Sequence, residues 1–600
     1  AGIGKTRCAD EFALIARRQG LQVWVGRCFQ HGSAPAFWPF IQVLRAACSD
    51  GTLNERLRTQ GLELLREIEP RPPEAQGATA ALPRQDGERF WLFDRLSRWL
   101  CRSAVSQARV IELEDIHCAD ESSLQVLSLL APMLRQARVL VIATARDVGA
   151  GLPRSAAALA VRMRPCEHMQ LVGLRGEDVE EYLRPLLDEQ LASRLALPLA
   201  TRSAGNPLFL YELARVVCTR YAHDRDVRVA ELPLPAAVTE IIGARLRELD
   251  QSTRAILDVA CVIGEELSIA VLQRASGRSA SEVLVALQAA TLADSIKRRS
   301  DGLTHAFTHP LVREVLYEAL STVQRAELHA AVGVALEALG LAKRSLYELA
   351  YHFHHAPLEA CYEKARRYGR LAGDAAMRGL AYDEAVQCYA WALEAQLQIA
   401  PDDVPGACDL LLTSASALGL AGRDADARRH CRRAIELASD AKLPKFLVRA
   451  ARQRRLSVWL AQIPDPMAKE ALELALRLLP EDASTMRAQA YAHLAVFPPY
   501  SLDVSAGRRL SAEAVRLASE TGDPELTREV QASRLFGLCA PDSHAEQLAV
   551  ADNLLQQDPR QNLRFAVDGH FARYHALMLQ GEGAKASQSL DAYAHLAREL

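Results

Sequence analysis

The chain begins Ala1-Gly2-Ile3-Gly4-Lys5-Thr6, the stretch on which the interpretation of the first domain depends. It is the closing part of the phosphate-binding pattern G-x-x-x-x-G-K-[ST], whose first glycine and the residue after it would precede Ala1. Lys5 is the only lysine in the first 296 residues of a chain with 8 lysines and 63 arginines. A compact ammonium fits beside phosphates inside a wrapped loop, where the planar arginine fork is too bulky. The stretch therefore predicts a nucleotide-phosphate loop in which Thr6 is a Mg²⁺ ligand.

The flanking sequence supports this interpretation, although a bare Gly-Lys-Thr is common in unrelated chains. Gly2 and Gly4 give the backbone the freedom to point N–H groups at phosphate oxygens. Residues 7–18 are expected to form a helix whose N-terminus faces the anion, and residues 21–26 a strand. We therefore expect a βαβ unit around the loop.

A second phosphate-chemistry signal is Val110-Ile111-Glu112-Leu113-Glu114-Asp115, a mostly apolar strand that ends in two carboxylates. Glu114 is the expected Mg²⁺ ligand, and Asp115 the residue that orients or activates the attacking water. Glu112 is unusual in a buried parallel strand, and it requires either an arginine partner or a position near a sheet edge. A strand end with solvated acids is the alternative interpretation of the run.

The continuation favours the catalytic interpretation. A helix follows Asp120, then an apolar strand over residues 139–144, and then Arg146. Ligands bind at the carboxyl ends of the strands in an open parallel sheet. Arg146 is therefore expected to sense the γ-phosphate, or else is a surface arginine at a strand end.

Three segments resemble the STAND-type signal-transduction ATPases, bacterial regulators with an AAA-like ATPase and helical repeats: Glu114 to Asp120, Gly32 to Phe40, and Gly205 to Phe209. Family members usually write the first as E-D-L-H-W-A-D. The resemblance implies an α/β P-loop ATPase core, a helical lid, a winged helix and an all-α tetratricopeptide-like solenoid. The expected boundaries are 1–165 for the core without its first strand, 166–235 for the lid, 236–340 for the winged helix and 341–600 for the repeats.

The resemblance also implies two further nucleotide contacts. Pro207, at the start of a lid helix, would pack near the adenine. His309 would reach the β-phosphate of bound ADP and hold a closed state. From the sequence alone, Pro207 marks only a sharp helix entry and His309 a cap of the helix that follows it.

Internal repetition is visible after about Leu346, where the chain reads as Ala- and Leu-rich helices. The triplet Ala385, Tyr389, Ala392 recurs 42 and then 41 residues later, with a weaker copy 39 residues further on. Small residues at i and i+7 let paired helices pack closely, so we expect extended or degenerate tetratricopeptide repeats; an irregular bundle is the alternative. A solenoid of this kind offers a surface for a protein, a peptide or a small inducer.

Composition limits the class of protein. Half of the 600 residues are hydrophobic, the formal net charge is −3, and no apolar run reaches the length of a membrane span. The charge balance does not indicate nucleic-acid binding. The 13 cysteines lack zinc-site spacing and indicate reduced thiols, so we expect a cytoplasmic location.

Together these features predict an ATP/ADP-switched regulator with slow turnover, Mg²⁺ as cofactor, and the repeats as the surface that binds a signal or partner. Self-association would follow nucleotide state, and DNA would be contacted only through an output domain outside this chain. The parent protein would be a transcriptional regulator or, alternatively, a cyclase-coupled one. A scaffold with a decayed nucleotide site and a ring-forming remodelling ATPase are the rivals. Because the loop's first glycine would precede Ala1, we expect this 600-residue chain to bind nucleotide weakly.

Overall fold

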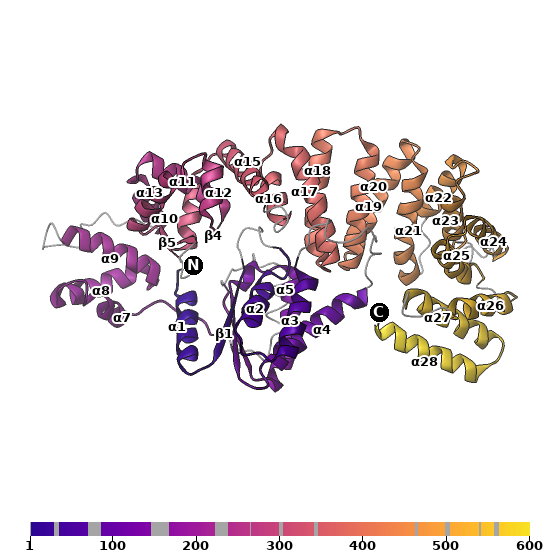
Figure 1. Ribbon diagram of the computed structural model, residues 1–600, viewed down its shortest axis with the longest axis horizontal. Coiled ribbons are helices and arrows are strands. Elements are labelled where there is room, and N and C mark those ends of the chain that lie inside the picture. The colour runs from indigo at the N-terminus through magenta and orange to yellow at the C-terminus, as the bar shows by residue number, and fades with distance from the viewer. Residues whose placement is uncertain are drawn as a thin grey trace. The chain divides into compact units, whose positions relative to one another are not determined.

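The computed structural model has a small parallel sheet near the N-terminus and a long series of helices after it (Figure 1). The residues that it describes are 2–28, 35–69, 86–145, 167, 169–221, 238–264, 266–298, 304–340, 346–461, 466–497, 504–538, 542–556 and 563–599. The chain divides into two compact units, residues 1–75 with 93–368 and residues 76–92 with 369–600. The predicted order of an α/β core followed by helical repeats is confirmed.

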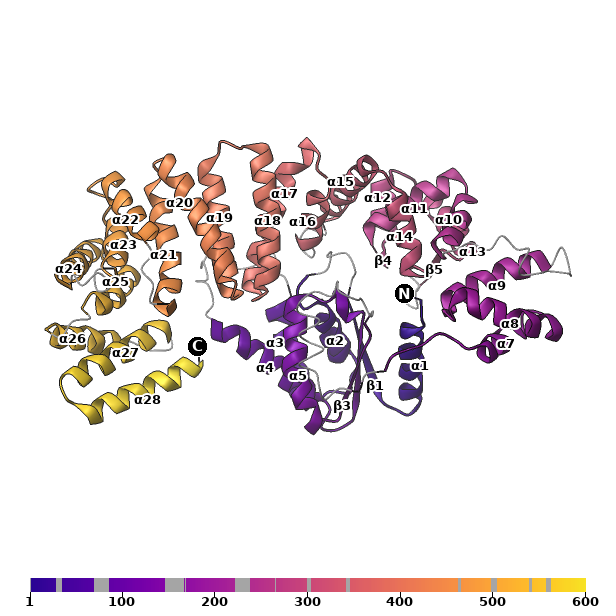
Figure 2. The ribbon, with the colours of Figure 1, turned by 180° about the vertical axis from the view of Figure 1, so that it is seen from behind.

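The α/β core is built on three parallel strands in the order β1-β2-β3: β1 (Gln22–Arg27), β2 (Arg109–Glu114) and β3 (Val139–Ala143). All six residues of the middle strand β2 are buried, as expected of a strand paired on both sides. The helices of the core are α1 (Lys5–Arg18), α2 (Trp38–Ser49), α3 (Glu55–Ile68), α4 (Asp86–Ser103) and α5 (Glu121–Met133). Helix α1 lies on one side of the strands and α2, α3 and α5 on the other (Figures 1 and 2). This layered arrangement brings the carboxyl ends of the strands to one edge.

The sequence places Phe90, Trp91, Phe93, Leu96, Trp99 and Leu100 at helical spacing, which predicts a buried face of α4. The structure forms this face only in part. The rings of Trp24 and Trp99 stack with centroids 6.3 Å apart, and Phe93 is buried. Phe90 and Trp91, which the helical spacing also predicts as core, are 54% and 43% exposed. The prediction is wrong for these two side chains, whose rings are largely exposed to solvent.

In the described residues, the core is followed by the helices α7 (Gly176–Leu183), α8 (Glu189–Ser203) and α9 (Pro207–Tyr221). They bury a hydrophobic cluster of their own, which includes Val179, Leu195 and Leu213. Gly205, in the turn before α9, has φ +68° and lies so close to residue 174 that a Cβ would be 2.4 Å from the Leu174 oxygen. Only glycine fits this turn, so the predicted sharp entry into α9 has a steric basis.

The next segment combines helices with a second sheet. Its elements are α10 (Val238–Arg247), α11 (Gln251–Ile263), β4 (Glu266–Leu267), α12 (Ile269–Ser276), α13 (Ala280–Leu292), β5 (Ile296–Arg298), β6 (His305–Phe307), α14 (Pro310–Ala319) and α15 (Thr322–Ala338). The strands are antiparallel in the order β4-β6-β5, and Ile296 of β5 pairs with Phe307 of β6. The Asp301-Gly302 pair predicts the turn of a β-hairpin between these two strands, and it lies outside the described residues. The winged-helix assignment stays a prediction.

A buried pair of histidines joins α15 to α16 (Leu346–His354). The Nδ1 atoms of His329 and His352 are 3.0 Å apart, so one ring donates to the other. Burial lowers the pKa of His329 to about 2, with His352 and His355 adding to the effect, and it lowers the pKa of His352 to about 3. Tyrosine, histidine and arginine side chains face the pair from the surrounding elements: Tyr317, Tyr351, His355, Arg313 and Arg325. Both rings are therefore neutral in the folded protein.

Acidification should destabilise this region selectively. The unfolded histidines take up protons first, because their pKa of about 6.5 lies above that of the folded ones. Stability is therefore fully present above about pH 6.5 and is lost as the pH falls, by up to about 1.4 kcal/mol per pH unit for each ring. Amide hydrogen exchange of α15 and α16 should accelerate between about pH 7 and about pH 5 beyond the intrinsic change. An unchanged protection of these helices, or an equal acid response in His352→Gln, would contradict this expectation.

The second unit consists of antiparallel helices packed in sequence. They continue from α17 (Glu359–Arg378) as α18 (Tyr382–Ile399), α19 (Val404–Leu420), α20 (Asp424–Asp440), α21 (Pro444–Ala461), α22 (Pro466–Leu478), α23 (Ser484–Leu494), α24 (Val504–Thr521), α25 (Pro524–Gly537), α26 (His544–Leu555), α27 (Leu563–Leu579) and α28 (Gly583–Glu599). The repeated small residues lie on alternate helices α18, α20, α22 and α24, and most are fully buried. On α24, a Cβ at Gly507 would lie 3.0 Å from the Gly537 oxygen of α25. The close helix packing predicted from the repetition is thus present.

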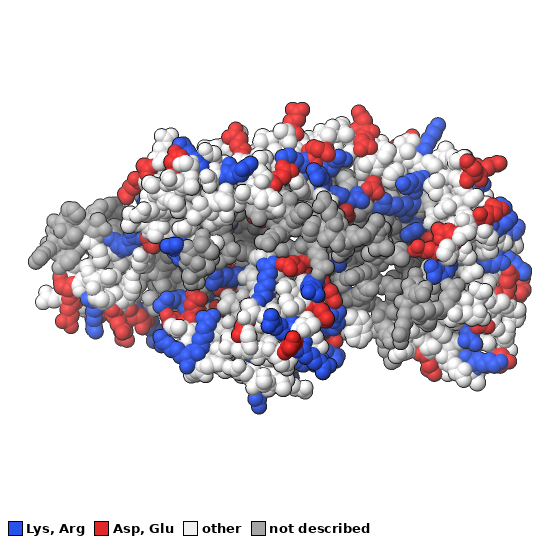
Figure 3. All heavy atoms as spheres, in the orientation of Figure 1, with Lys and Arg blue, Asp and Glu red and all other residues white. Residues whose placement is uncertain are grey.

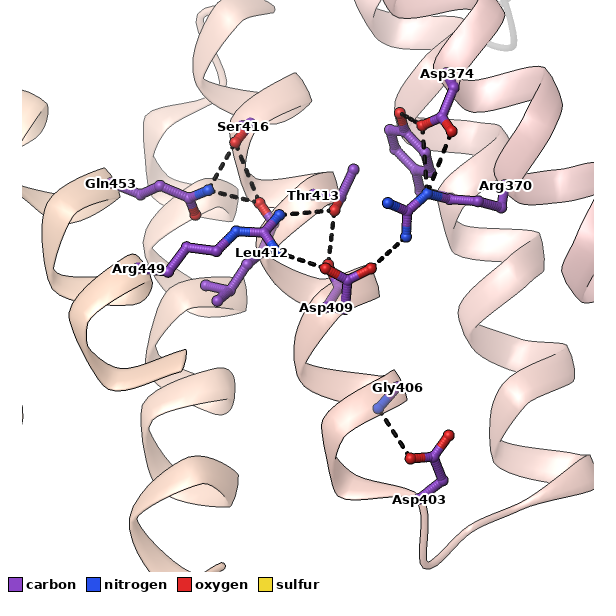
Figure 4. A network of polar contacts seen from close by, with 11 residues as sticks. Arg370, Asp374, Asp403, Gly406, Asp409, Leu412, Thr413, Ser416, Arg449 and Gln453 are labelled. Carbon is purple, nitrogen blue, oxygen red and sulfur yellow. Dashed lines mark hydrogen bonds and ion pairs between the residues drawn. The ribbon is translucent and has the colours of Figure 1, made fainter. Parts of the chain in front are cut away.

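Polar contacts join α17, α19 and α21, the helices that alternate with those that carry the small residues (Figure 4). Asp409 of α19 pairs with Arg370 of α17 through one oxygen and with Arg449 of α21, at 2.5 Å, through the other. Gln453 of α21 donates to the Leu412 oxygen of α19 at 3.0 Å. A shared carboxylate with an arginine on each side fixes the spacing of α17, α19 and α21, which are alternate helices of the unit. Within the described residues, no helix is both long and apolar enough to cross a bilayer.

Candidate nucleotide-binding site

The predicted phosphate loop turns sharply into a helix. Gly2 and Gly4 have φ values of +74° and +99°, and α1 begins immediately afterwards at Lys5. The first N–H groups of a helix have no partner within it, and the helix dipole adds positive potential there. Lys5 is partly exposed and Thr6 is exposed at this N-terminus. The loop and α1 therefore present N–H groups, an ammonium and a hydroxyl together, as an anion site requires.

A second helix N-terminus lies against this loop. The Leu208 N–H at the start of α9 donates to the Gly2 oxygen at 3.3 Å, and the Asn206 side chain accepts from Leu208 and Phe209. A Cβ on Gly2 would be 2.8 Å from the Leu208 Cβ, so only glycine permits the approach. Pro207 is thereby brought beside the loop, across 205 residues of sequence.

The two acids of β2 lie in different surroundings. Glu114 is 8% exposed, and its Oε1 accepts from Arg27 Nε at 2.7 Å. Asp115 follows the strand with φ +53°, a left-handed conformation that aspartate tolerates. Its N–H donates to Thr144 Oγ1 at 2.9 Å, at the end of β3. His117 Nδ1 lies 3.8 Å from its carboxylate. Asp115 is thus held at the carboxyl edge of the sheet.

Glu112 does not have the surroundings that the sequence predicts. It is 2% exposed, no hydrogen-bond donor among the described residues reaches its Oε1, and β2 is paired on both sides. Both expectations, an arginine partner and a position near a sheet edge, are therefore wrong. Arg27 pairs with Glu114 instead. Burial, together with the nearby Glu114 and Asp10 carboxylates, raises the pKa of Glu112 to about 7.

Asp120 joins two of the segments that carry the family resemblance, Glu114 to Asp120 and Gly32 to Phe40. Its Oδ1 accepts from the Ser123 N–H at 2.8 Å, which caps α5, and also from the Phe37 N–H at 3.1 Å, at the start of α2. Phe37 itself is fully buried and has φ +60°. One carboxylate thereby holds the turn after β2 and the entry to α2 in a fixed relation.

We expect Asp120→Ala to open this connection at a cost of about 3 kcal/mol, since it removes a helix cap and a second buried charge-assisted hydrogen bond. Asp250→Ala is a matched control, because Asp250 caps α11 through Thr253 with the same geometry but, among the described residues, its carboxylate bonds only Ser252 and Thr253. Amide exchange of residues 35–40 should accelerate in Asp120→Ala and stay unchanged in Asp250→Ala. Equal protection in the two variants would show that Asp120 is only a local cap.

Two predicted site residues remain, His309 and Arg146. His309 caps α14, accepting from the Leu311 N–H through Nδ1 at 3.1 Å, so the capping alternative is confirmed. The neutral ring then carries its proton on Nε2, and its role toward a β-phosphate stays a prediction. Arg146 lies outside the described residues.

Arg27 and Thr144 are contacts of the site that the sequence reasoning missed. Arg27 is the last residue of β1 and is paired in register with Glu114. Once the strands are taken as parallel neighbours, their carboxyl ends place these two side chains together. Thr144 was recognised only as the end of an apolar strand.

Residues 1–142 match the family model of the AAA ATPase domain. The N-terminal region is an AAA-type ATPase domain. The chain is also 25% identical over 465 residues to an uncharacterized protein of Rhizobium meliloti (strain 1021), an alignment that covers 73% of this chain and 44% of that protein. The chain thus spans less than half the length of this curated relative.

Among solved structures, the chain is similar to a Signal Transduction ATPase with Numerous Domains (STAND) protein with a tetratricopeptide repeat sensor from Pyrococcus horikoshii. The identity is 13% and the TM-score 0.38, and the alignment covers 100% of this chain and 92% of the other.

The donor set of the ATPase domain suits a magnesium–nucleotide complex. The Thr6 hydroxyl and the Glu114 carboxylate are oxygen ligands, which Mg²⁺ prefers. Because Glu114 Oε1 accepts from Arg27, a metal ion bound there would share this carboxylate with the arginine. Thr6 and Glu114 are therefore suitable ligands for the Mg²⁺ of a bound nucleotide.

Proposed function

We propose that the chain is part of an ATP/ADP-switched signal-transduction regulator. The proposal is carried by one observation, the contact of Leu208 with Gly2, which sets the N-termini of α1 and α9 against the same loop. A nucleotide bound there touches both segments, and loss or gain of its γ-phosphate changes what holds them together. The boundaries 1–165, 166–235, 236–340 and 341–600 are proposed as the functional parts.

Each residue of the site has a proposed role. The loop N–H groups of Gly2 and Gly4, with Lys5, bind the β- and γ-phosphates, and Thr6 and Glu114 hold Mg²⁺. When bound, Mg²⁺ supplies positive charge that neutralises the phosphates. Asp115 orients the attacking water.

The other three proposed contacts surround the nucleotide. Arg146 senses the γ-phosphate, Pro207 packs beside the base, and His309 donates from Nε2 to the β-phosphate. The last contact closes the ADP form, so exchange for ATP would release it.

The repeats are proposed as the sensing surface. On the face in Figure 3, lysines and arginines are interspersed with aspartates and glutamates over the repeat helices. A mixed face of this kind favours a protein or small-molecule partner over nucleic acid, which is matched by a basic strip. DNA contact would then need a domain outside this chain. We propose a transcriptional regulator, with a cyclase-coupled regulator as the alternative.

Size measurement of the full-length protein tests the switch. With ADP we expect the small form, and with a slowly hydrolysed ATP analogue a larger assembly, because the closed state opens. A hexamer that forms regardless of nucleotide would favour a ring-forming remodelling ATPase. A size that never responds to nucleotide would favour a scaffold with a decayed site.

A further inference from the structure

Three carboxylates converge between α1 and β2. Asp10 of α1 and Glu112 and Glu114 of β2 each place an oxygen within 4.8 Å of the others. Glu112 and Glu114 are two residues apart on a strand and so point to the same face. Asp10 is one helical turn beyond Thr6 and faces them. The cluster thus lies next to the expected magnesium ligands but is made mainly of other residues.

The cluster is short of positive charge. Arg27 pairs with Glu114, and Arg17 acts on Glu112 only from an exposed position on α1. Three ionised carboxylates against Arg27 would leave a net charge of −2. Buried carboxylates at this separation are costly unless a cation or a proton compensates them.

The buried side chain of Glu112 is a second observation, after the charge imbalance, that indicates a ligand at this cluster. Its side chain is 2% exposed, and its Oε1 is buried without a hydrogen-bond donor among the described residues. Buried carboxylate oxygens in native proteins are almost always satisfied, so an unsatisfied one beside two further carboxylates indicates a missing ligand. A proton would satisfy Glu112 alone, whereas a doubly charged cation would balance the whole cluster.

We propose that Asp10, Glu112 and Glu114 bind a hard divalent cation in the absence of nucleotide. Oxygen ligands at about 2.1–2.5 Å from one ion lie at most about 5 Å apart, which is compatible with the spacing of 4.8 Å or less here. Oxygen-only ligation selects Mg²⁺, Mn²⁺ or Ca²⁺ over softer metals. The site shares Glu114 with the magnesium site of the proposed function and otherwise does not depend on it. A cation there would tie α1 to β2 and hold the phosphate loop in place before nucleotide arrives.

Titration with Mn²⁺ tests this in the nucleotide-free, full-length protein, with free Mn²⁺ followed by electron paramagnetic resonance. We expect one saturable Mn²⁺ per chain, displaced by Ca²⁺. Asp10→Asn should weaken binding by about 10-fold or more, since affinity follows the number of charged ligands, and Glu112→Gln should do the same. Glu11→Gln is the matched control, because Glu11 is exposed and paired with Arg7, and its variant should bind as the wild type does.

Thermal melting separates a cation from a proton. If the cluster binds a cation, Mn²⁺ should raise the melting temperature of the wild type, and Glu112→Gln should be more stable than the metal-free wild type but insensitive to Mn²⁺. If Glu112 is merely protonated, no saturable Mn²⁺ will be found and Glu112→Gln will leave the melting temperature unchanged at neutral pH. That result would overturn the proposal, as would Mn²⁺ binding that both variants retain.

The outcome is independent of nucleotide binding. Lys5→Ala should keep the Mn²⁺ site while losing ATP, so failure of the proposed function would leave this site standing. The converse, ATP binding without nucleotide-free Mn²⁺ binding, would remove the site and leave the function. Should Glu112→Gln fail to fold, the exposed Asp10→Asn decides alone.

Discussion

Replacing Lys5 with alanine in the full-length protein should weaken ATP and ADP binding by about 100-fold or more. The ammonium at the start of α1 is expected to make charge-assisted hydrogen bonds to the phosphates, each worth about 1.5–3 kcal/mol, and about 1.4 kcal/mol corresponds to a tenfold change. Calorimetric titration of both nucleotides measures the effect. Lys297→Ala is the control: this lysine is next along the chain and exposed on β5, and its loss should leave the affinity unchanged.

The two outcomes separate the switch from its structural rival. Tight binding by the wild type that is lost in Lys5→Ala supports a working phosphate loop. Equal and negligible binding by both proteins would identify a scaffold with a decayed site, in which Gly2 and Gly4 serve only the turn into α1.

Asp115→Asn should lower ATP turnover by about 100- to 1000-fold while nucleotide affinity stays within about twofold. A carboxylate that orients or deprotonates the attacking water contributes about this much to the rate. Asparagine tolerates the left-handed conformation that residue 115 adopts and has the same shape, so the Thr144 contact of its backbone N–H should survive. The loss would then report on chemistry rather than on folding.

Single-turnover hydrolysis by the wild type, Asp115→Asn and Glu121→Gln provides the measurement. Glu121 is an acid in the first turn of α5, outside the proposed site, and its variant should hydrolyse ATP at the wild-type rate. If Asp115→Asn is as fast as the wild type, the catalytic carboxylate is another residue, and Glu114 is the next candidate.

The sequence predicted the parts of the fold that depend on local patterns. The glycines around Lys5, the apolar runs of β2 and β3 and the spacing of small residues such as Ala385 and Ala468 each require one backbone arrangement. Their elements are present with bounds close to those expected. The contact between Gly2 and Leu208 could not be predicted from local patterns, because it joins residues that are far apart in the sequence. The resemblance alone indicated that Pro207 belongs near the loop.

The hydrogen-bond and ion-pair partners of individual side chains were the hardest feature to predict from the sequence. The sequence shows that Glu112 is unusual in a buried strand. Which acid pairs with Arg27 depends on the register of β1 against β2, which the sequence does not show. The approach of Asp10 depends on the rotation of α1 over the sheet, which an exposed helical acid does not reveal. The same limit applies to Asp120, whose bond to the Phe37 N–H spans 83 residues.

Hydrogen exchange of the full-length protein with and without ADP tests the central claim most directly. The account predicts that ADP protects residues 2–6 and residues 206–210 together, while α27 and α28 stay unchanged, because the loop and the start of α9 line one nucleotide site. Protection of residues 2–6 alone, or ADP binding that protects neither segment, would contradict it.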